Sequence, residues 1–213
     1  VGKRVVVEPC MGAVMFGGAF LKHSRHGTAY PLIREAIAGE AIFAFAYAEP
    51  QARYTWQDLK TTAVKDGTGY VINGQKSVVI GAPWATHLIV TARTGGGQRD
   101  AQGVSVFLVD KTAKGVTTRD YPTVDGQRAS EVTFENVSVG VDALIGAEGH
   151  GLPLVEKVMD EAIAAKIGRA SCRERVEISV VAVSLKKKKQ QTKIDDHSYC
   201  QTNSTVSLLV TDY

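Results

Sequence analysis

The sequence lacks the features that mark secreted and membrane proteins. It has only three cysteines, and two of them, Cys172 and Cys200, lie near the C-terminal end. Cys10 alone cannot form an internal disulfide, so we expect a reducing compartment and a cytoplasmic location. No apolar run approaches the ~18–20 residues that a helix needs to cross a bilayer, and we therefore expect no membrane partner.

Motifs for metal ions and for nucleotide phosphates are missing as well. The chain has no GxGxxG motif, and the glycine-rich segment 146–151 lacks the Lys-Ser/Thr pair that a P-loop requires. None of the five histidines has metal-ligand spacing: His23, His26, His87, His150 and His197. These absences argue against a Rossmann domain, a P-loop and a metal site.

Charge is distributed unevenly along the chain. The formal net charge is +3, but residues 1–165 hold 16 Lys+Arg and 17 Asp+Glu, a net charge of −1. Residues 166–213 hold 9 and 5, a net charge of +4. A nucleic-acid partner would therefore depend on the C-terminal segment alone.

That C-terminal segment has an unusual origin. From Lys166 it reads KIGRASCRERVEISVVAVSLKKKK, which matches the translation of a common short-read sequencing adapter followed by poly-A. We therefore expect residues 167–213 to be a non-native, disordered tail and the preceding residues to be a fragment. The alternative is a natural basic tail that binds nucleic acid or a membrane; we expect no such partner.

Hydrophobic periodicity divides the rest of the chain into three parts. Residues 4–20 are apolar and rich in glycine, and residues 28–38 have an apolar face typical of a helix: Leu32, Ile33, Ala36 and Ile37. From residue 42 to about 144 the period changes to two, with Val, Ile and Thr between turn residues, which predicts several short strands. Helical spacing returns at 149–165. The pattern predicts an α+β protein with a β-barrel or β-sandwich in the middle.

Two details of the middle part matter most. A short apolar run ends in Glu49-Pro50, and the dipeptide Asn73-Gly74 lies inside GYVINGQK. Asn-Gly tolerates positive φ at both positions, so we predict a hairpin turn there. The glycine-rich segment 94–103 predicts a second, mobile hairpin loop.

This order of apolar strand, Glu-Pro, polar loop, "TTA" strand and "GYVINGQK" resembles the middle β-domain of the acyl-CoA dehydrogenases. The resemblance continues through HLIVTART, GVSVFLVDKTAKGVTTRDY, ASEVTFENVSVG and ALIGAEGHGLPLV. It implies the end of an N-terminal helical domain at 1–41, the middle β-domain at 42–148, and the first helix of a C-terminal domain at 149–166. Within the family, the chain is most similar to the small subunit of pimeloyl-CoA dehydrogenase.

The family resemblance implies an FAD site on two segments. The first holds Phe45, Ala46, Tyr47 and Ala48, and the second holds Val78, Val79 and Ile80. Many members have Thr at the position of Ala48 and Trp-Ile-Thr at 78–80, so this chain lacks two hydroxyls and an aromatic wall. The alternative is that these are plain core residues of a β-domain.

The resemblance also implies that acyl-CoA contacts the loop after Pro50. Members usually continue Gly-Ala-Gly-Ser-Asp, whereas this chain has Arg53 and Tyr54. Arg53 is suited to pair with a CoA phosphate or with the distal carboxylate of a dicarboxylic acyl chain. The alternatives are a solvated loop arginine and an aromatic residue that anchors the loop.

No catalytic base is expected in this chain. Glu49 has the position of a structural strand-end residue, and the helical position that serves one branch of the family falls on Ala162 rather than Glu161. The resemblance implies oxidation of an acyl-CoA to the 2,3-enoyl-CoA, an electron-transfer flavoprotein as acceptor, and a homo- or hetero-oligomer. The chain itself is expected to be inactive. The alternative is a non-catalytic β-domain that binds acyl-CoA or a partner protein.

Overall fold

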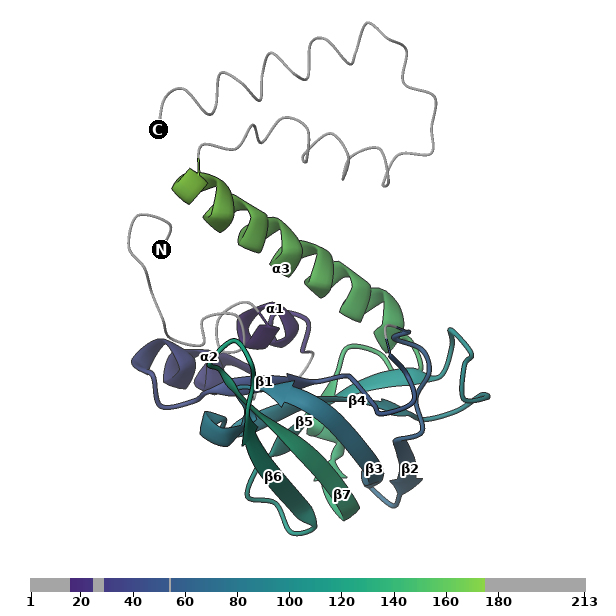
Figure 1. The fold of residues 1–213 in the computed structure, drawn as a ribbon. Helices are drawn as coiled ribbons and strands as arrows, with labels where there is room; N and C mark the ends of the chain where they lie inside the picture. Colours follow the sequence, from purple (N-terminus) through teal and green to yellow (C-terminus); the bar gives the residue numbers. More distant parts are fainter. Residues whose placement is uncertain (1–15, 25–28, 54, 175–213) are drawn as a thin grey trace, which may run out of the picture. The chain divides into compact units, whose positions relative to one another are not determined.

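The computed structural model describes residues 16–24, 29–53 and 55–174 (Figure 1). Its helical elements are α1 (Gly18–Leu21), α2 (Ala29–Ala38), the 3-10 helices η2 (Ala82–Trp84) and η3 (Val141–Ala143), and α3 (Gly151–Glu174). Its strands are β1 (Phe43–Ala46), β2 (Thr62–Asp66), β3 (Gly69–Ile80), β4 (His87–Arg93), β5 (Val104–Asp110), β6 (Val116–Pro122), β7 (Arg128–Gly140) and β8 (Leu144–Ile145). Residues 7–163 form one compact unit, which contains all of these strands.

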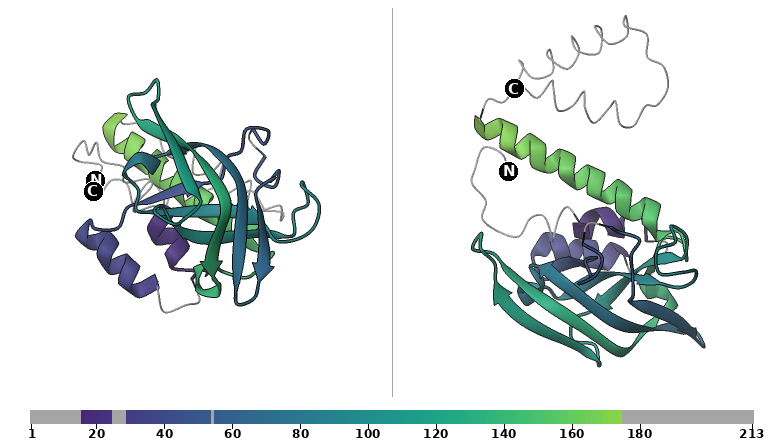
Figure 2. Two further views of the ribbon diagram at one scale, coloured as in Figure 1. Left: turned by 90° about the horizontal axis from the view of Figure 1, so that it is seen from below. Right: turned by 45° about the vertical axis from the view of Figure 1, so that its right-hand side comes forward.

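The strands form one sheet in the order β6-β7-β3-β2-β4-β5-β8. β1 lies off this path and pairs in parallel with β4, from Phe43 opposite His87 to Ala46 opposite Val90. Most other neighbours are antiparallel. The sheet curves, so that β6, β7 and β3 form one wall, and β1, β4 and β5 form the other (Figures 1 and 2).

Two apolar cores lie on opposite sides of the β1-β4-β5 wall. The first core fills the space inside the curved sheet, with residues such as Tyr70, Leu88 and Phe107 from three different strands. The second joins the outer face of that wall to the helices, and contains Phe45 of β1 and Val155 of α3. β4 contributes to both cores because its two faces are both buried.

The α2 helix confirms the helical prediction for residues 28–38, although Thr28 lies outside the described residues. Leu32, Ile33 and Ala36 pack on the second core, as predicted, but Ile37 is 82% exposed. The helix ends at Gly39, whose φ of +83° suits a glycine after the last helical residue.

The predicted hairpin turn at Asn73-Gly74 is wrong. These residues lie inside the continuous strand β3, and the turn is at Gly67-Thr68, where Asp66 pairs with Gly69. The strand has a register shift against β7 between Ile72 and Gly74. The Asn73 side chain accepts a hydrogen bond from the backbone N of Asn136 at 2.7 Å, so Asn-Gly here serves a bulge.

The α3 helix begins close to the predicted position and passes Lys166 without interruption to Glu174. Residues 175–213, which make up most of the predicted tail, lie outside the described residues. So do residues 1–15, which include most of the apolar, glycine-rich segment 4–20. None of the helices in the described ranges is long and apolar enough to cross a membrane.

Candidate functional site

The structure brings the two predicted cofactor segments together. The backbone N of Ser77 in β3 donates a hydrogen bond to the backbone O of Ala48 at 2.8 Å. Residues 47 and 48 follow directly after β1, whereas residues 78–80 end β3. Two segments that lie 30 residues apart in the sequence are therefore neighbours in space.

The seven predicted cofactor residues differ in how far their side chains are exposed to solvent. The side chains of Phe45, Ala46 and Val79 are buried in the two cores, so only their backbone is available to a ligand. Ala48 is half-buried. The remaining three are not core residues, since Tyr47 is 36% exposed, Val78 51% and Ile80 50%.

A β-bulge at the end of β3 determines which of residues 78–80 are exposed. The register against β7 shifts between Lys76 and Val79, and Val78 has a φ of +52°. Positive φ is rare for a β-branched residue. The extra residue turns both Lys76 and Val79 inward, although they are three positions apart, and leaves Val78 and Ile80 outside.

A cavity of about 140 Å³ lies beside this surface. It is lined by Tyr47 and Ala48 and by four residues of the pocket loop, which we define as residues 50–60. The lining residues are Tyr47, Ala48, Ala52, Arg53, Thr55 and Trp56. The Tyr47 and Trp56 rings stack, with centroids 5.6 Å apart and planes inclined by 21°. The cavity thus has an aromatic wall, although β3 carries no aromatic residue at 78–80.

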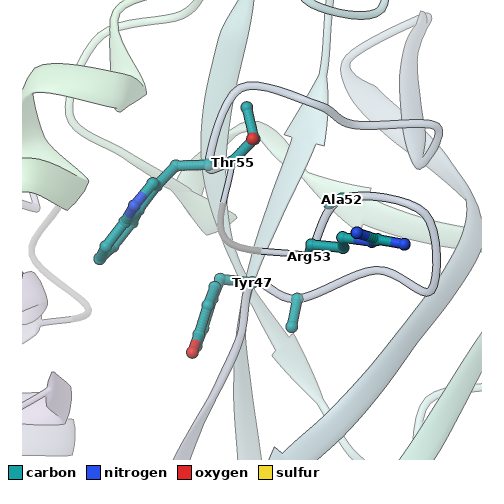
Figure 3. Close-up of a pocket in the computed structure, with 6 residues that line it drawn as sticks. Tyr47, Ala52, Arg53 and Thr55 are labelled. Atoms are coloured by element: carbon teal, nitrogen blue, oxygen red, sulfur yellow. The ribbon is translucent and has the colours of Figure 1, made fainter.

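Arg53, one of the two predicted substrate residues, lines the cavity, with its side chain exposed and extended on the side away from the Tyr47 ring (Figure 3). Its backbone φ is +48°, a conformation that non-glycine residues seldom adopt. The guanidinium therefore lies at the rim. Tyr54, the other predicted substrate residue, lies outside the described residues.

Glu49 closes the pocket loop at its base. Its carboxylate accepts hydrogen bonds from the backbone N of Lys60 at 2.7 Å and of Thr61 at 3.1 Å, and so joins both ends of the loop. The Lys76 ammonium donates to the same carboxylate at 2.8 Å and to the Thr91 hydroxyl at 3.1 Å. Glu49 is thus a structural residue, in agreement with the prediction that it is not the catalytic base.

Burial and pairing act in opposite directions on these two groups. Burial raises the pKa of Glu49, but the Lys76 charge and four hydrogen-bond donors outweigh it, so the pKa lies below its ordinary value. Burial lowers the pKa of Lys76 to about 8, and attraction to Glu49 offsets only part of that effect. The ion pair holds because its partners satisfy each other where neither side chain reaches solvent.

The described part of α3 supplies no carboxylate at the predicted base position. Ala162 is buried against the domain, whereas Glu161 is exposed. In the described residues, no group of three or more His, Cys, Asp or Glu side chains is arranged to hold a metal ion. The candidate site consists of apolar, aromatic and backbone groups, with the Arg53 guanidinium at its rim.

Sequence reasoning missed three residues that organise this site. Lys76 pairs with Glu49, while Asp58 and Arg93 connect the pocket loop to the loop between β4 and β5. Lys76 occupies an inward position of an alternating strand, and Arg93 ends an apolar strand. A charged residue at a buried position requires a partner, and this was the signal that the sequence offered.

Comparison with known proteins agrees with this geometry. The family description "Acyl-CoA dehydrogenase, middle domain" matches residues 44–137. Residues 44–137 are thus similar to an acyl-CoA dehydrogenase middle domain. The match includes both candidate cofactor segments, the pocket loop and most of the sheet. The α+β fold predicted from the sequence is that of this domain with adjoining helices, and FAD is the cofactor of the family.

Curated relatives carry the same domain. The chain is 38% identical over 120 residues to acyl-CoA dehydrogenase FadE29 of Mycobacterium tuberculosis, covering 56% of this chain and 31% of the relative. It is 31% identical over 169 residues to benzylmalonyl-CoA dehydrogenase of Aromatoleum aromaticum, covering 72% and 44%. The chain spans about a third of the length of the first curated relatives that it matches.

A solved structure has the same fold. The ChsE4-ChsE5 complex of Mycobacterium tuberculosis is 28% identical and superimposes with a TM-score of 0.63. The aligned region covers 68% of this chain and 38% of that one. The acyl-CoA dehydrogenase likeness therefore extends from the sequence to the three-dimensional fold.

Proposed function

We propose that this chain forms part of an FAD-dependent acyl-CoA dehydrogenase that oxidises an acyl-CoA to the 2,3-enoyl-CoA. The observation that carries the proposal is the joining of residues 47–48 to residues 78–80 by the Ser77–Ala48 hydrogen bond. The joined segments present three exposed apolar side chains beside a cavity. Flat, apolar surface of this kind fits one side of a flavin ring.

The residues present fit the cofactor through shape and apolar contact. Tyr47, Val78 and Ile80 would contact the ring, and the backbone of 45–48 and 78–80 would contribute its polar groups. Bound FAD would supply the redox chemistry by accepting a hydride from the acyl chain. This chain's own residues would exclude water from one face of the ring and hold the thioester beside it.

We further propose that the cavity takes part of the acyl-CoA and that Arg53 binds an anionic group at its rim. A dicarboxylic acyl group such as pimeloyl is favoured, because an exposed guanidinium suits a distal carboxylate. The name of the relative benzylmalonyl-CoA dehydrogenase supports such a substrate, since a malonyl group carries a second carboxylate. A CoA phosphate is the other anion that Arg53 could bind.

Partners follow from the same proposal. The electron acceptor would be an electron-transfer flavoprotein, and the enzyme would form a homo- or hetero-oligomer. The second point is supported by the solved ChsE4-ChsE5 complex, which contains two different chains. Exposed apolar residues such as Val124 and Trp84 are available for such contacts.

Binding experiments test the proposal without requiring turnover. The full chain should take up FAD with a shifted flavin absorbance spectrum, and pimeloyl-CoA should bind more tightly than heptanoyl-CoA in isothermal titration calorimetry. Arg53→Gln should remove that difference if Arg53 binds the distal carboxylate. It should weaken both ligands equally if Arg53 binds CoA. A chain that binds acyl-CoA but never FAD would instead support the non-catalytic module.

A further inference from the structure

Arg93 is the point at which two loops meet. The first is the pocket loop, and the second is the loop between β4 and β5, residues 94–103, which we call the brace loop. The Arg93 residue ends β4 and is nearly completely buried, with 6% of its surface exposed. A buried cation at this position requires partners, and the two loops provide them.

The Arg93 guanidinium donates hydrogen bonds to five backbone carbonyls. One acceptor belongs to the pocket loop, the carbonyl of Gln57 at 2.6 Å. The other four belong to the brace loop, at distances of 3.0 to 3.3 Å: Gly95, Gln98, Asp100 and Gln102. All of these bonds come from Nη1 and Nη2, whereas the buried Nε has no partner among the described residues. The planar group thus sets the path of the brace loop and ties it to the pocket loop.

Asp58 provides a second connection between the same loops. Its carboxylate accepts hydrogen bonds from Gln98 Nε2 at 2.6 Å and from Arg99 Nε at 2.8 Å. The backbone N of Leu59 also donates to the carbonyl of Gln98 at 3.1 Å. The two loops are therefore joined by side-chain and main-chain contacts on both sides of Arg93.

We propose that the brace loop holds the pocket loop in its ligand-binding shape and that Arg93 is the positioning residue. The cavity-lining residues Arg53, Thr55 and Trp56 lie on the same loop as Gln57 and Asp58, within a few residues of these contacts. Glu49 ties the base of the pocket loop, whereas Arg93 and Asp58 tie its outer side. This inference deepens the proposed function and rests on it for the meaning of the cavity.

The chemistry of Arg93 favours a positional role that lysine could not fill. Its fork reaches five carbonyls on two separate loops, whereas an ammonium has only three donors, all on one atom. Burial lowers the pKa of Arg93, and the nearby carboxylates of Asp100, Asp58 and Glu49 oppose that effect. The guanidinium remains charged, since an arginine pKa lies far above neutral pH.

The experiment uses the full chain with Trp84→Phe, so that Trp56 is the single tryptophan reporter. Hydrogen exchange of residues 51–59 and acrylamide quenching of Trp56 are compared in three variants: Arg93→Met, Arg93→Lys and Arg119→Met. Arg119 is the matched control because it is exposed on β6, away from both loops. Far-UV circular dichroism checks that each variant is folded.

We expect Arg93→Met to speed exchange in the pocket loop at least about tenfold and to raise Trp56 quenching, because several charge-assisted hydrogen bonds are lost. Arg93→Lys should resemble Arg93→Met, and Arg119→Met should resemble wild type. Unchanged exchange and quenching in a folded Arg93→Met would overturn the proposal. So would full rescue by lysine, since charge alone would then suffice.

A milder variant covers the case in which Arg93→Met does not fold. Arg99→Ala removes an exposed side chain and its ion pair with Asp58, and should speed exchange about two- to fivefold. Unchanged hydrogen exchange in Arg99→Ala would count against the proposal that the brace loop holds the pocket loop. The outcome is separable from the proposed function: if wild type binds no acyl-CoA but the variants loosen the pocket loop, the brace stands and the assigned ligand does not.

Discussion

Lys76 and Glu49 form a buried ion pair, with 2.8 Å between Nζ and Oε1 and at most 1% of either side chain exposed. The pair joins the middle of β3 to the start of the pocket loop. It lies directly beneath the surface that carries Tyr47 and Ala48, since Lys76 Nζ also approaches the carbonyl of Tyr47 at 3.5 Å. The shape of the candidate site therefore depends on two charges that no ligand would touch.

The effects of substitutions at Lys76 and Glu49 on the free energy of unfolding are predicted to be strongly non-additive. Glu49→Gln or Lys76→Met alone should lower the free energy of unfolding by about 3–5 kcal/mol, because each leaves one buried charge without its partner. The double variant should cost much less than the sum of the two. Urea denaturation of the four proteins measures this coupling, and additive losses would show that the charges are solvated.

The same pair predicts how stability depends on pH. The folded-state pKa of Glu49 lies below its ordinary value of 4.5, so its contribution is fully present above that value. It is lost as pH falls through the lower, folded-state pKa, because the unfolded chain then binds more protons. The stability of wild type relative to the double variant should therefore fall as the pH drops below about 4.5. A constant difference would contradict this.

Gly74 is predicted to resist substitution. A Cβ added there would lie 2.5 Å from Thr61 Oγ1 and 2.6 Å from Thr61 Cα. Gly74→Ala should therefore lower the free energy of unfolding by about 1–3 kcal/mol through overpacking. Gly18→Ala, which has open space around its Cβ, is the control and should be close to neutral. Thermal melts of both variants provide the comparison, and equal melting temperatures would refute the argument.

Restored hydroxyls should strengthen flavin binding if the proposed function is correct. Ile80 is half exposed and Ala48 lies beside the cavity, so Thr can replace either without disturbing a core. Each added hydroxyl should tighten FAD binding by up to about tenfold, the effect of one net hydrogen bond. Val64→Thr on the exposed side of β2 is the control. Fluorescence titration with FAD measures the dissociation constants, and weaker binding by Ile80→Thr would place the ring elsewhere.

The sequence pattern predicted helices and strands correctly where its apolar positions are also the buried positions of the fold. The helix at 29–38 and the strands around Tyr70, Leu88 and Val106 appear where alternation or helical spacing predicts them. The turn at Asn73-Gly74 failed because a two-residue signal competes with twelve residues of ladder hydrogen bonds in β3. The true turn is Gly67-Thr68, where Gly67 takes the first central position with a φ of +55°.

The candidate site could be predicted only in part. Family resemblance identified the two segments and Arg53, but exposure at 78–80 depends on a bulge that periodicity cannot reveal. Lys76 lies 27 residues from Glu49, and Arg93 lies 36 residues from its pocket-loop acceptor, Gln57. Such pairings arise from the sheet topology, so single-residue patterns carry no information about them.

The left-handed Val78 has a consequence for how this surface can change over evolutionary time. The bulge determines which residues of β3 point outward. The outward direction of positions 78 and 80 is therefore a property of the backbone and not of the side chains found there. Replacement of these side chains can therefore diversify the surface without repacking the interior. Straightening the bulge at constant chain length would instead exchange inside and outside, placing Val79 in solvent. The strand thus tolerates new side chains at 78 and 80 but not the loss of its bulge.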